Sequence, residues 1–223
     1  MIKAVIFDID GTLIDSVDAH AESWVRTFKE FGKEISFEAA GKLVGMGSDQ
    51  FLSDYFSTEE VEKKKKEIDE YRSELVKKEY MAKIKPFPKV RDLFLKLKKD
   101  NIKIALASSA TKEEVEKYEE IAGIKDLVEK KTSTDDAEKS KPEPDIFLAA
   151  YDKLGKIDKQ DIVVIGDTPY DAVAAKKAEL KIIGVLTGGW AKKKLVKSGC
   201  SEVFEDIAAI YEKHYENAFK KSK

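Results

Sequence analysis

The chain has 223 residues, and although 38% of them are charged, the formal net charge is only −2. This length suits one core domain with a sizeable insertion. Positive and negative residues are interspersed, which is typical of a solvated surface and argues against a nucleic-acid-binding protein. Cys200 is the only cysteine, so an internal disulfide is excluded. No signal peptide precedes the first predicted strand and no apolar run approaches transmembrane length, so we expect a cytoplasmic protein that binds no membrane.

The first predicted element is a short buried strand over residues 3–7, which leads directly into two aspartates. Asp8 and Asp10 are separated by one residue, so an extended chain places both carboxylates on the same side. Gly11 then permits a sharp turn. Open parallel sheets bind ligands at the carboxyl ends of their strands, and a cation there would relieve the repulsion between two carboxylates. Taken alone, the pair is equally compatible with an ordinary acidic turn.

The next segment carries helical patterns and no strand. Apolar residues at steps of three and four predict an amphipathic helix that is capped near Asp15 or Ser16 and ends at Gly32. The further helices expected here are residues 37–44, residues 48–56 and a long charged helix from residue 57 or 58 to about residue 82. Gly45 and Gly47 lie in the loop before the third helix. Four helices without a strand predict a small bundle inserted into the first crossover.

From residue 87 onwards strands and helices alternate, which predicts a parallel sheet with helices on both faces. The expected strands are residues 103–107, 127–131, 162–165, 181–185 and 202–204. The expected helices are residues 90–97, 112–122, 145–154, 171–178, 191–197 and a terminal helix from residue 207. The sequence therefore predicts an α/β fold with a Rossmann-like core, formed by residues 1–14 and 87–223, and an inserted α-helical cap over residues 15–86.

Two sites in this core have residues that suit a phosphate. Ser108 and Ser109 come directly after the second core strand, where hydroxyl donors and free helix amides suit phosphate oxygens; an ordinary helix cap is the alternative. Lys141 precedes Pro142 and Pro144, which fix the backbone ahead of the next helix. An ammonium held there is a fitting counter-charge for a phosphoryl group, and a surface lysine is the alternative.

A further acidic site follows the strand at residues 162–165. This strand ends at Gly166, so Asp167 is expected at the same edge of the sheet as Asp8. A single carboxylate at a strand tip is difficult to explain as a purely structural feature. Asp171 is expected at the start of a helix, where an acid can cap the helix or support a bound metal.

Taken in order, these four sites resemble the four motifs of the haloacid dehalogenase-like hydrolase superfamily, most of whose members are Mg²⁺-dependent phosphatases. The first motif begins at Asp8 and reads DIDGTLIDS. The helical insertion resembles the α-helical cap of the family, and the chain is most similar to the branch of phosphoglycolate phosphatase and β-phosphoglucomutase. The resemblance implies a phosphatase that acts on phosphomonoesters of small soluble metabolites, with phosphoglycolate and sugar phosphates as the leading substrates, and that is a monomer or a homodimer.

The resemblance also implies a role for each matching residue. Asp8 would be the nucleophile that forms an aspartyl-phosphate, and Asp10 would be the general acid and then the general base. Mg²⁺ would be held by Asp8, the main-chain carbonyl of Asp10 and Asp167, with Asp171 steadying the waters of the ion. The residues that would bind the phosphoryl oxygens are Ser108, Ser109 and Lys141.

Three residues of the insertion are expected to face the substrate, namely His20, Gly45 and Gly47. His20 lies on the first helix of the insertion, and a partly buried packing role is its alternative. The glycines permit a hinge or a close approach of the loop that ends at Ser48. β-Phosphoglucomutase has an arginine where this chain has Ser48, so we expect no clamp for a second phosphate in this loop.

Three other functions were weighed against the phosphatase. A phosphomutase would use the same aspartyl-phosphate and interconvert sugar phosphates without net phosphate release. A dehalogenase would need neither a metal nor an acid at the position of Asp10. A non-catalytic sensor of phosphorylated metabolites would tolerate loss of the nucleophile, whereas Asp8, Asp10, Lys141 and Asp167 are all present. The complete set favours the phosphatase.

Overall fold

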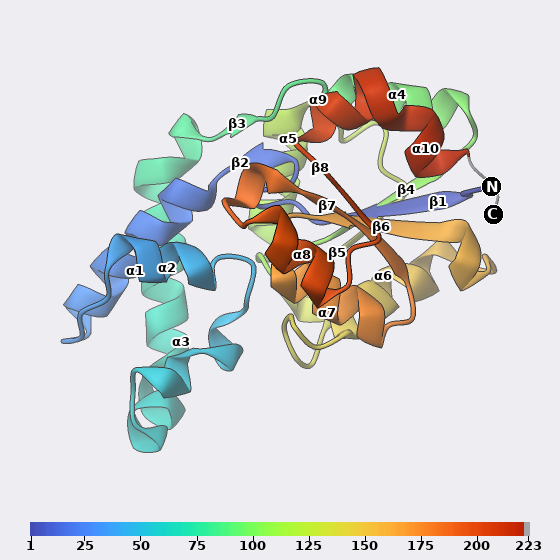
Figure 1. Ribbon diagram of the computed structural model, residues 1–223. Coiled ribbons are helices and arrows are strands. Elements are labelled where there is room, and N and C mark those ends of the chain that lie inside the picture. Colours follow the sequence, from blue (N-terminus) through green and yellow to red (C-terminus); the bar gives the residue numbers. More distant parts are fainter. Residues whose placement is uncertain (221–223) are drawn as a thin grey trace.

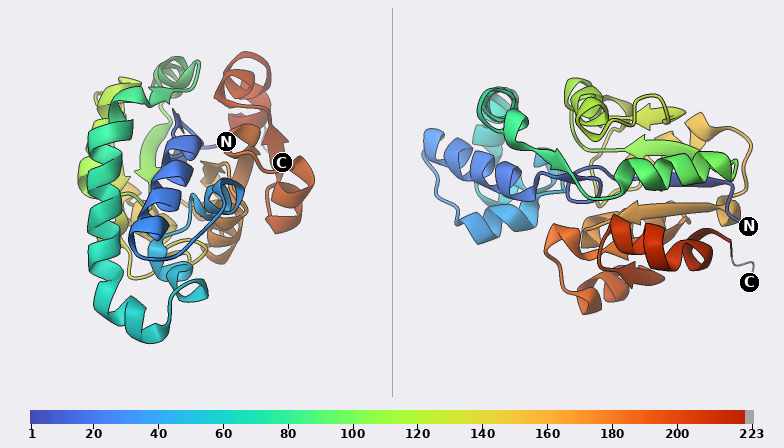
Figure 2. Two further views of the ribbon diagram at one scale, coloured as in Figure 1. Left: turned by 90° about the vertical axis from the view of Figure 1, so that its left-hand side faces the viewer. Right: turned by 90° about the horizontal axis from the view of Figure 1, so that it is seen from above.

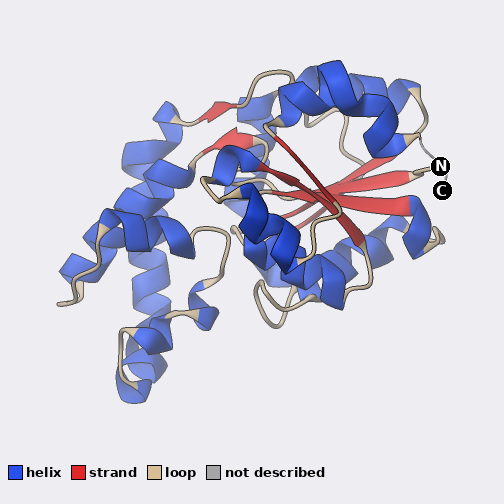
Figure 3. Ribbon diagram, viewed as in Figure 1, coloured by secondary structure: helices blue, strands red, loops and turns tan. Residues whose placement is uncertain are grey.

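A computed structural model describes residues 1–220 of the chain. Its main sheet has six parallel strands in the order β5-β4-β1-β6-β7-β8 (Figures 1 and 3). The strands are β1 (Ala4–Phe7), β4 (Lys103–Ala107), β5 (Lys130–Thr132), β6 (Ile162–Gly166), β7 (Lys181–Val185) and β8 (Glu202–Phe204). The predicted α/β fold with a Rossmann-like core is therefore confirmed.

The central strand β1 is buried on both faces of the sheet. Val5 and Phe7 belong to one apolar cluster, and Ala4 and Ile6 belong to another, as the alternation of side chains along a strand requires. Residues of the neighbouring strands and of the flanking helices supply the other members of each cluster. The first face is covered by α4 (Val90–Lys99), α5 (Lys112–Ala122), α9 (Ile207–Ala209) and α10 (Tyr215–Phe219), and the second by α6 (Asp145–Leu154), α7 (Pro169–Lys177) and α8 (Lys192–Ser198).

The register of β1 decides which residues meet at the carboxyl edge of the sheet. Phe7 pairs with Leu106 of β4 and with Ile165 of β6. The residues that follow these three positions therefore emerge side by side. The chain runs outward from β1 to β4 and β5 and then returns to β6, so the end of β1 is the switch point at which open α/β sheets bind ligands.

The helical insertion after β1 lies beyond the carboxyl end of the sheet, away from the chain termini (Figures 1 and 2). Its helices are α1 (Val17–Glu30), α2 (Phe37–Leu43) and α3 (Thr58–Leu75). Trp24, Phe28, Phe51 and Phe56 are buried together in it, and the ring centroids of Trp24 and Phe51 are 4.9 Å apart. An antiparallel ribbon of β2 (Ile14–Asp15) and β3 (Lys85–Pro86) joins the insertion to the core.

Three details of the elements differ from the sequence prediction. The helix expected at residues 48–56 is replaced by two 3₁₀ turns, Ser48–Gln50 and Leu52–Asp54, because Phe51 leaves the helical conformation to pack against Trp24. The long helix ends its α-helical part at Leu75 and continues as a π turn and a 3₁₀ turn, Val76–Tyr80 and Met81–Lys83. The strand expected at residues 127–131 begins only at Lys130, since Leu127 packs into the core ahead of the pairing with β4.

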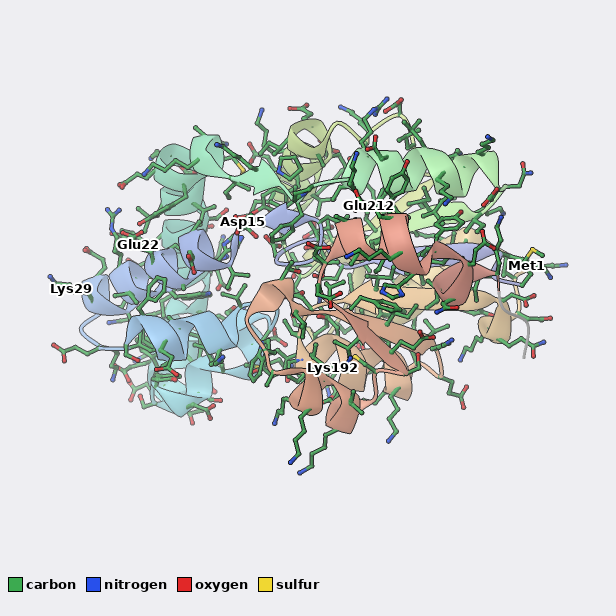
Figure 4. The ribbon with its side chains drawn as sticks, turned by 45° about the horizontal axis from the view of Figure 1, so that its top comes forward. Met1, Asp15, Glu22, Lys29, Lys192 and Glu212 are labelled. Carbon is green, nitrogen blue, oxygen red and sulfur yellow. The ribbon has the colours of Figure 1, made fainter. Side chains whose placement is uncertain are left out.

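The outward faces of the helices carry charged side chains. Figure 4 shows this for Glu22 and Lys29 of α1 and for Lys192 of α8, all of which are exposed. Within residues 1–220, no helix combines the length and the apolar character needed to cross a membrane.

Candidate active site

Three buried aspartates meet at the carboxyl edge of the sheet. Asp8 follows β1, Asp167 follows β6, and Asp171 lies in the first turn of α7. Oxygen atoms of the three carboxylates all lie within 4.8 Å of one another. The register of β1 and β6 explains the approach of Asp8 to Asp167, because Phe7 and Ile165 are paired.

Lys141 supplies a positive charge to this cluster. Its Nζ lies 2.5 Å from Asp8 Oδ1 and 2.8 Å from Asp171 Oδ1, and the lysine is only 1% exposed. Although burial disfavours the charged ammonium, Asp171 and Asp8 raise the pKa of Lys141 above its ordinary value. The alternative of a surface lysine is therefore wrong.

Thr12 links two of the acids. Its hydroxyl lies 3.0 Å from Asp8 Oδ2 and 2.8 Å from Asp167 Oδ1. The other oxygen, Asp167 Oδ2, is buried and has no hydrogen-bond partner within residues 1–220. A Cβ at Gly11 or at Gly188 would overlap the Asp167 carboxylate, so both glycines are needed to leave it room. Sequence reasoning assigned no role to Thr12, although it belongs to the first motif.

The cluster holds more negative charge than Lys141 neutralises. Burial, together with the charges of Asp171 and Asp10, raises the pKa of Asp8 to about 7 against the opposing effect of Lys141. Burial and the charges of Asp8 and Asp171 also raise the pKa of Asp167 well above its usual value. Hard divalent cations prefer carboxylate oxygens. The unpartnered oxygen of Asp167 beside Asp8 therefore fits a magnesium ion.

Asp171 is both part of the helix cap and part of the site. Its Oδ2 accepts hydrogen bonds from the main-chain N–H and the hydroxyl of Thr168, which is the N-cap of α7. Its Oδ1 accepts from Lys141. The cap interpretation of Asp171 is therefore confirmed, and its support of a bound metal stays a prediction. Within the cluster, Asp171 binds the ammonium of Lys141 and helps to hold it in place.

Asp10 lies at the centre of a second network, which connects the core to the insertion. Its Oδ1 accepts a hydrogen bond from Ser16 Oγ at 2.7 Å and lies 2.8 Å from His20 Nε2. His20 Nε2 is also 3.0 Å from the hydroxyl of Tyr118, and Arg72 Nη2 lies 2.6 Å from His20 Nδ1. An arginine can only donate, so Nδ1 accepts and Nε2 carries the proton that faces Asp10.

This network lowers the pKa of Asp10. Burial alone would raise the pKa of Asp10, but His20 and Ser16 stabilise the carboxylate and lower the pKa to about 2. Ser16 is the N-cap of α1 by position, yet its side chain makes no cap hydrogen bond and serves Asp10 instead. Tyr118 and Arg72 were missed by sequence reasoning, because each looks like an ordinary member of an amphipathic helix.

The remaining predicted residues surround a cavity of about 160 Å³ between the core and the insertion. Its walls include Asp8, Asp10, Ser108, Ser109 and Lys141 from the core and His20, Trp24, Gly45, Gly47 and Arg72 from the insertion. Asp167 and Asp171 are not among the residues that line the cavity, although their carboxylates lie close to that of Asp8. The structure thus brings together the predicted core residues and the predicted residues of the insertion.

Ser108 is not the cap of the following helix. The N-cap of α5 is Thr111, which forms a capping box with Glu114. Ser108 Oγ instead accepts the main-chain N–H of Ala110 at 3.0 Å, and Ser109 Oγ is buried without a hydrogen-bond partner among the described residues. The alternative of an ordinary helix cap is wrong for both serines.

The glycine loop of the insertion closely approaches the core. Gly45 has φ +93°, and a Cβ there would overlap the side chain of Thr168. A Cβ at Gly47 would overlap Ser140, the residue before Lys141. The carboxylate of Asp49 also accepts the main-chain N–H of Ser140 at 3.2 Å. These contacts place the loop directly over the lysine.

Residues 5–185 match the family model described as haloacid dehalogenase-like hydrolase. The chain belongs to this family. It is 29% identical over 195 residues to the phosphoglycolate phosphatase of Aquifex aeolicus, covering 83% of this chain and 85% of that protein. It is 32% identical over 216 residues to the chloroplastic Arabidopsis thaliana protein SUPPRESSOR OF QUENCHING 1, of which it spans only 20%. A hydrolase from Pseudomonas syringae superposes with a TM-score of 0.87 at 25% identity, covering 97% of this chain and 99% of that chain.

Proposed function

We propose that the chain is a Mg²⁺-dependent phosphatase that hydrolyses phosphomonoesters of small metabolites through an aspartyl-phosphate. The observation that carries this proposal is Asp8, a buried carboxylate held by Lys141 at the floor of a cavity. Asp10 lies in the same cavity, two residues along the chain. A nucleophile beside an acid–base group and a fixed cation is the equipment that phosphoryl transfer to a side chain requires.

Lys141 has two tasks in this mechanism. It holds one oxygen of Asp8, so that the other oxygen is directed by Thr12 alone and can attack phosphorus. Its charge also offsets the repulsion between a phosphate dianion and the surrounding carboxylates. Asp171 would keep the ammonium in this position, since it binds Nζ while its own second oxygen is fixed by Thr168.

We propose that Mg²⁺ is held by Asp8, Asp167 and the main-chain carbonyl of Asp10. The unpartnered Asp167 Oδ2 and the raised pKa of Asp8 are what a site built for a cation should show without one. When bound, the ion would neutralise charge on the phosphoryl oxygens.

Asp10 would act as the base that activates water in the second half of the reaction. The pKa of about 2 keeps its carboxylate ionised in the absence of substrate. A phosphate dianion bound beside Asp10 would raise this pKa, because like charges disfavour the ionised form. Asp10 could then protonate the leaving alcohol in the first half of the reaction.

The helical insertion would act as a cap over residues 1–14 and 87–223. It supplies one wall of the cavity, and the β2–β3 ribbon is its connection to the core. A cap that moves on this ribbon would admit substrate and then exclude water during transfer. Residues 15–86 would thereby decide which alcohols are accepted, with His20, Gly45 and Gly47 in contact with the substrate.

The test is release of phosphate from p-nitrophenyl phosphate. We expect activity with Mg²⁺, none with excess EDTA, and recovery when Mg²⁺ is added back. Asp8→Asn should abolish turnover, whereas Asp152→Asn, which changes an exposed aspartate of α6, should not. Full activity in EDTA would refute the metal-dependent mechanism. Interconversion of sugar phosphates without phosphate release would identify a phosphomutase instead.

A further inference from the structure

One cation of the cavity wall forms no direct ion pair among residues 1–220. The basic residues in the cavity wall are Lys65, Arg72 and Lys141. Lys141 is paired with Asp8 and Asp171, and Lys65 lies 2.6 Å from an oxygen of Asp69. Within residues 1–220, Arg72 forms no ion pair with a carboxylate. A guanidinium in a partly enclosed cavity without a direct carboxylate partner can bind an anion.

The guanidinium of Arg72 is held in a fixed place. It lies over the ring of Trp24, 4.8 Å from the centroid, and Nη2 donates to His20 Nδ1 at 2.6 Å. Its Nε is buried and has no hydrogen-bond partner among the described residues. A guanidinium has five N–H donors, and one of them is used. The side chain is therefore ordered by the protein and retains donors for a ligand.

Arg72 lies on the side of the cavity where the proposed reaction would place the leaving alcohol of the substrate. Only the imidazole of His20 separates it from Asp10, which is the group assigned to protonate the leaving alcohol. The cavity of about 160 Å³ is smaller than the pockets of ~300–1,000 Å³ that hold drug-sized ligands. A substrate that fits it has few atoms beyond its phosphate.

We propose that Arg72 binds a second anionic group on the alcohol part of the substrate. The preferred substrates are then small phosphate esters that carry a carboxylate or a second phosphate, and neutral alcohols of the same size are poorer. The inference rests on the proposed phosphatase function and adds the substrate class. The expectation drawn from Ser48 concerned only the loop of the insertion, and α3 would supply the arginine in place of that loop.

The nearby acids do not cancel this charge. The carboxylate of Asp49 accepts hydrogen bonds from Gln50 and from the main chain of Ser140, and Asp69 is paired with Lys65. Glu114 uses one oxygen in the capping box of Thr111. The second oxygen of Glu114 is buried without a hydrogen-bond partner among the described residues, and none of these three acids forms an ion pair with Arg72. The charge of Arg72 helps to lower the pKa of Asp10, but the two side chains are connected only through the imidazole of His20. Arg72 therefore keeps its remaining N–H donors for an anion.

The experiment compares three substrates that share a three-carbon skeleton. Glycerol 1-phosphate has a neutral end, 3-phosphoglycerate has a carboxylate, and glycerol 1,3-bisphosphate has a second phosphate. We expect the wild type to favour at least one of the two anionic compounds over the neutral one. Arg72→Gln should reduce that preference in kcat/KM by about tenfold or more, mainly through KM. The anionic compound that loses its advantage identifies which group Arg72 binds.

Two variants separate recognition from general effects. Lys66→Gln removes the same charge from the exposed face of α3 and should leave the preference unchanged. Arg72→Lys keeps the charge but cannot form two parallel hydrogen bonds, so it should retain part of the preference; it also tests the idea if Arg72→Gln does not fold.

Equal losses on all three substrates in Arg72→Gln would mean that Arg72 only orients His20, and the inference would be overturned. A wild-type preference for the neutral compound would overturn it as well. Both outcomes differ from failure of the phosphatase proposal, which would show as no hydrolysis of p-nitrophenyl phosphate, a substrate without a second anion.

Discussion

Asp8→Asn should stabilise the metal-free protein while abolishing its activity. The pKa of Asp8 is about 7 in the folded chain in place of the ordinary 3.8. When folding raises the pKa of an acid, the free energy of unfolding falls as the pH rises above the pKa of the unfolded chain. The loss of stability is complete once the pH exceeds the pKa of the folded chain. The difference corresponds to about 4 kcal/mol at pH 8. Asparagine has nearly the same shape and carries no charge.

The net gain should be smaller than this figure, since Lys141 loses one of its two partners in the variant. We expect Asp8→Asn to be more stable by about 2 kcal/mol at pH 8 in EDTA, which corresponds to about 4–8 °C in Tm for a chain of this size. The advantage should fade as the pH falls from 7 towards 4, because Asp8 is then protonated in the folded chain and the pH approaches its ordinary pKa of 3.8 in the unfolded chain.

The measurement is thermal unfolding followed by circular dichroism between pH 4 and 8, with EDTA and with Mg²⁺. Magnesium should raise the Tm of the wild type more than that of Asp8→Asn. Asp152→Asn serves as the control, because this residue is exposed on α6. An Asp8→Asn protein that is less stable than the wild type at pH 8 in EDTA would refute the argument that uncompensated charge strains this site.

Three further predictions concern other parts of the molecule. Asp10→Asn should lower kcat by about 10²–10⁴ for an alkyl phosphate but less for p-nitrophenyl phosphate, whose leaving group needs little protonation; equal losses on both would argue against an acid role. Burial raises the pKa of Cys200 to about 12, so iodoacetamide at pH 8 should label this thiol only after the protein unfolds. Mass spectrometry measures the labelling, and rapid labelling of the native protein would contradict the prediction. Phe28→Ala removes a fully buried ring of the insertion and should cost about 3–5 kcal/mol in urea unfolding, whereas a loss below 1 kcal/mol would mean that this cluster is loosely packed.

Local sequence patterns were sufficient to predict most of the fold. The continuous apolar run of β1, the helix start after Ser57 and the return to a strand pattern after Pro88 are visible within a few residues of each element. The prediction of a helix at residues 48–56 was wrong because a contact distant in the sequence competed with the local pattern. Phe51 leaves the helical conformation and packs against Trp24. Its periodicity in the sequence fits a helix equally well.

The sequence by itself determined which carboxylates meet at the carboxyl edge of the sheet. Asp8, Asp10 and Asp167 follow strand ends, and strand ends can be read from short apolar runs and glycines. Parallel pairing then brings such residues together whatever the details of packing, because the carboxyl ends of parallel strands share one edge.

Only the tertiary structure decided what faces these residues from the insertion. Arg72 and Tyr118 lie on helices whose periodicity shows which side is apolar but not what that side meets. Their positions depend on how the insertion sits on its ribbon and on how α5 packs beneath it. That arrangement arises from many contacts between residues distant in the sequence, so no short stretch of the chain encodes it.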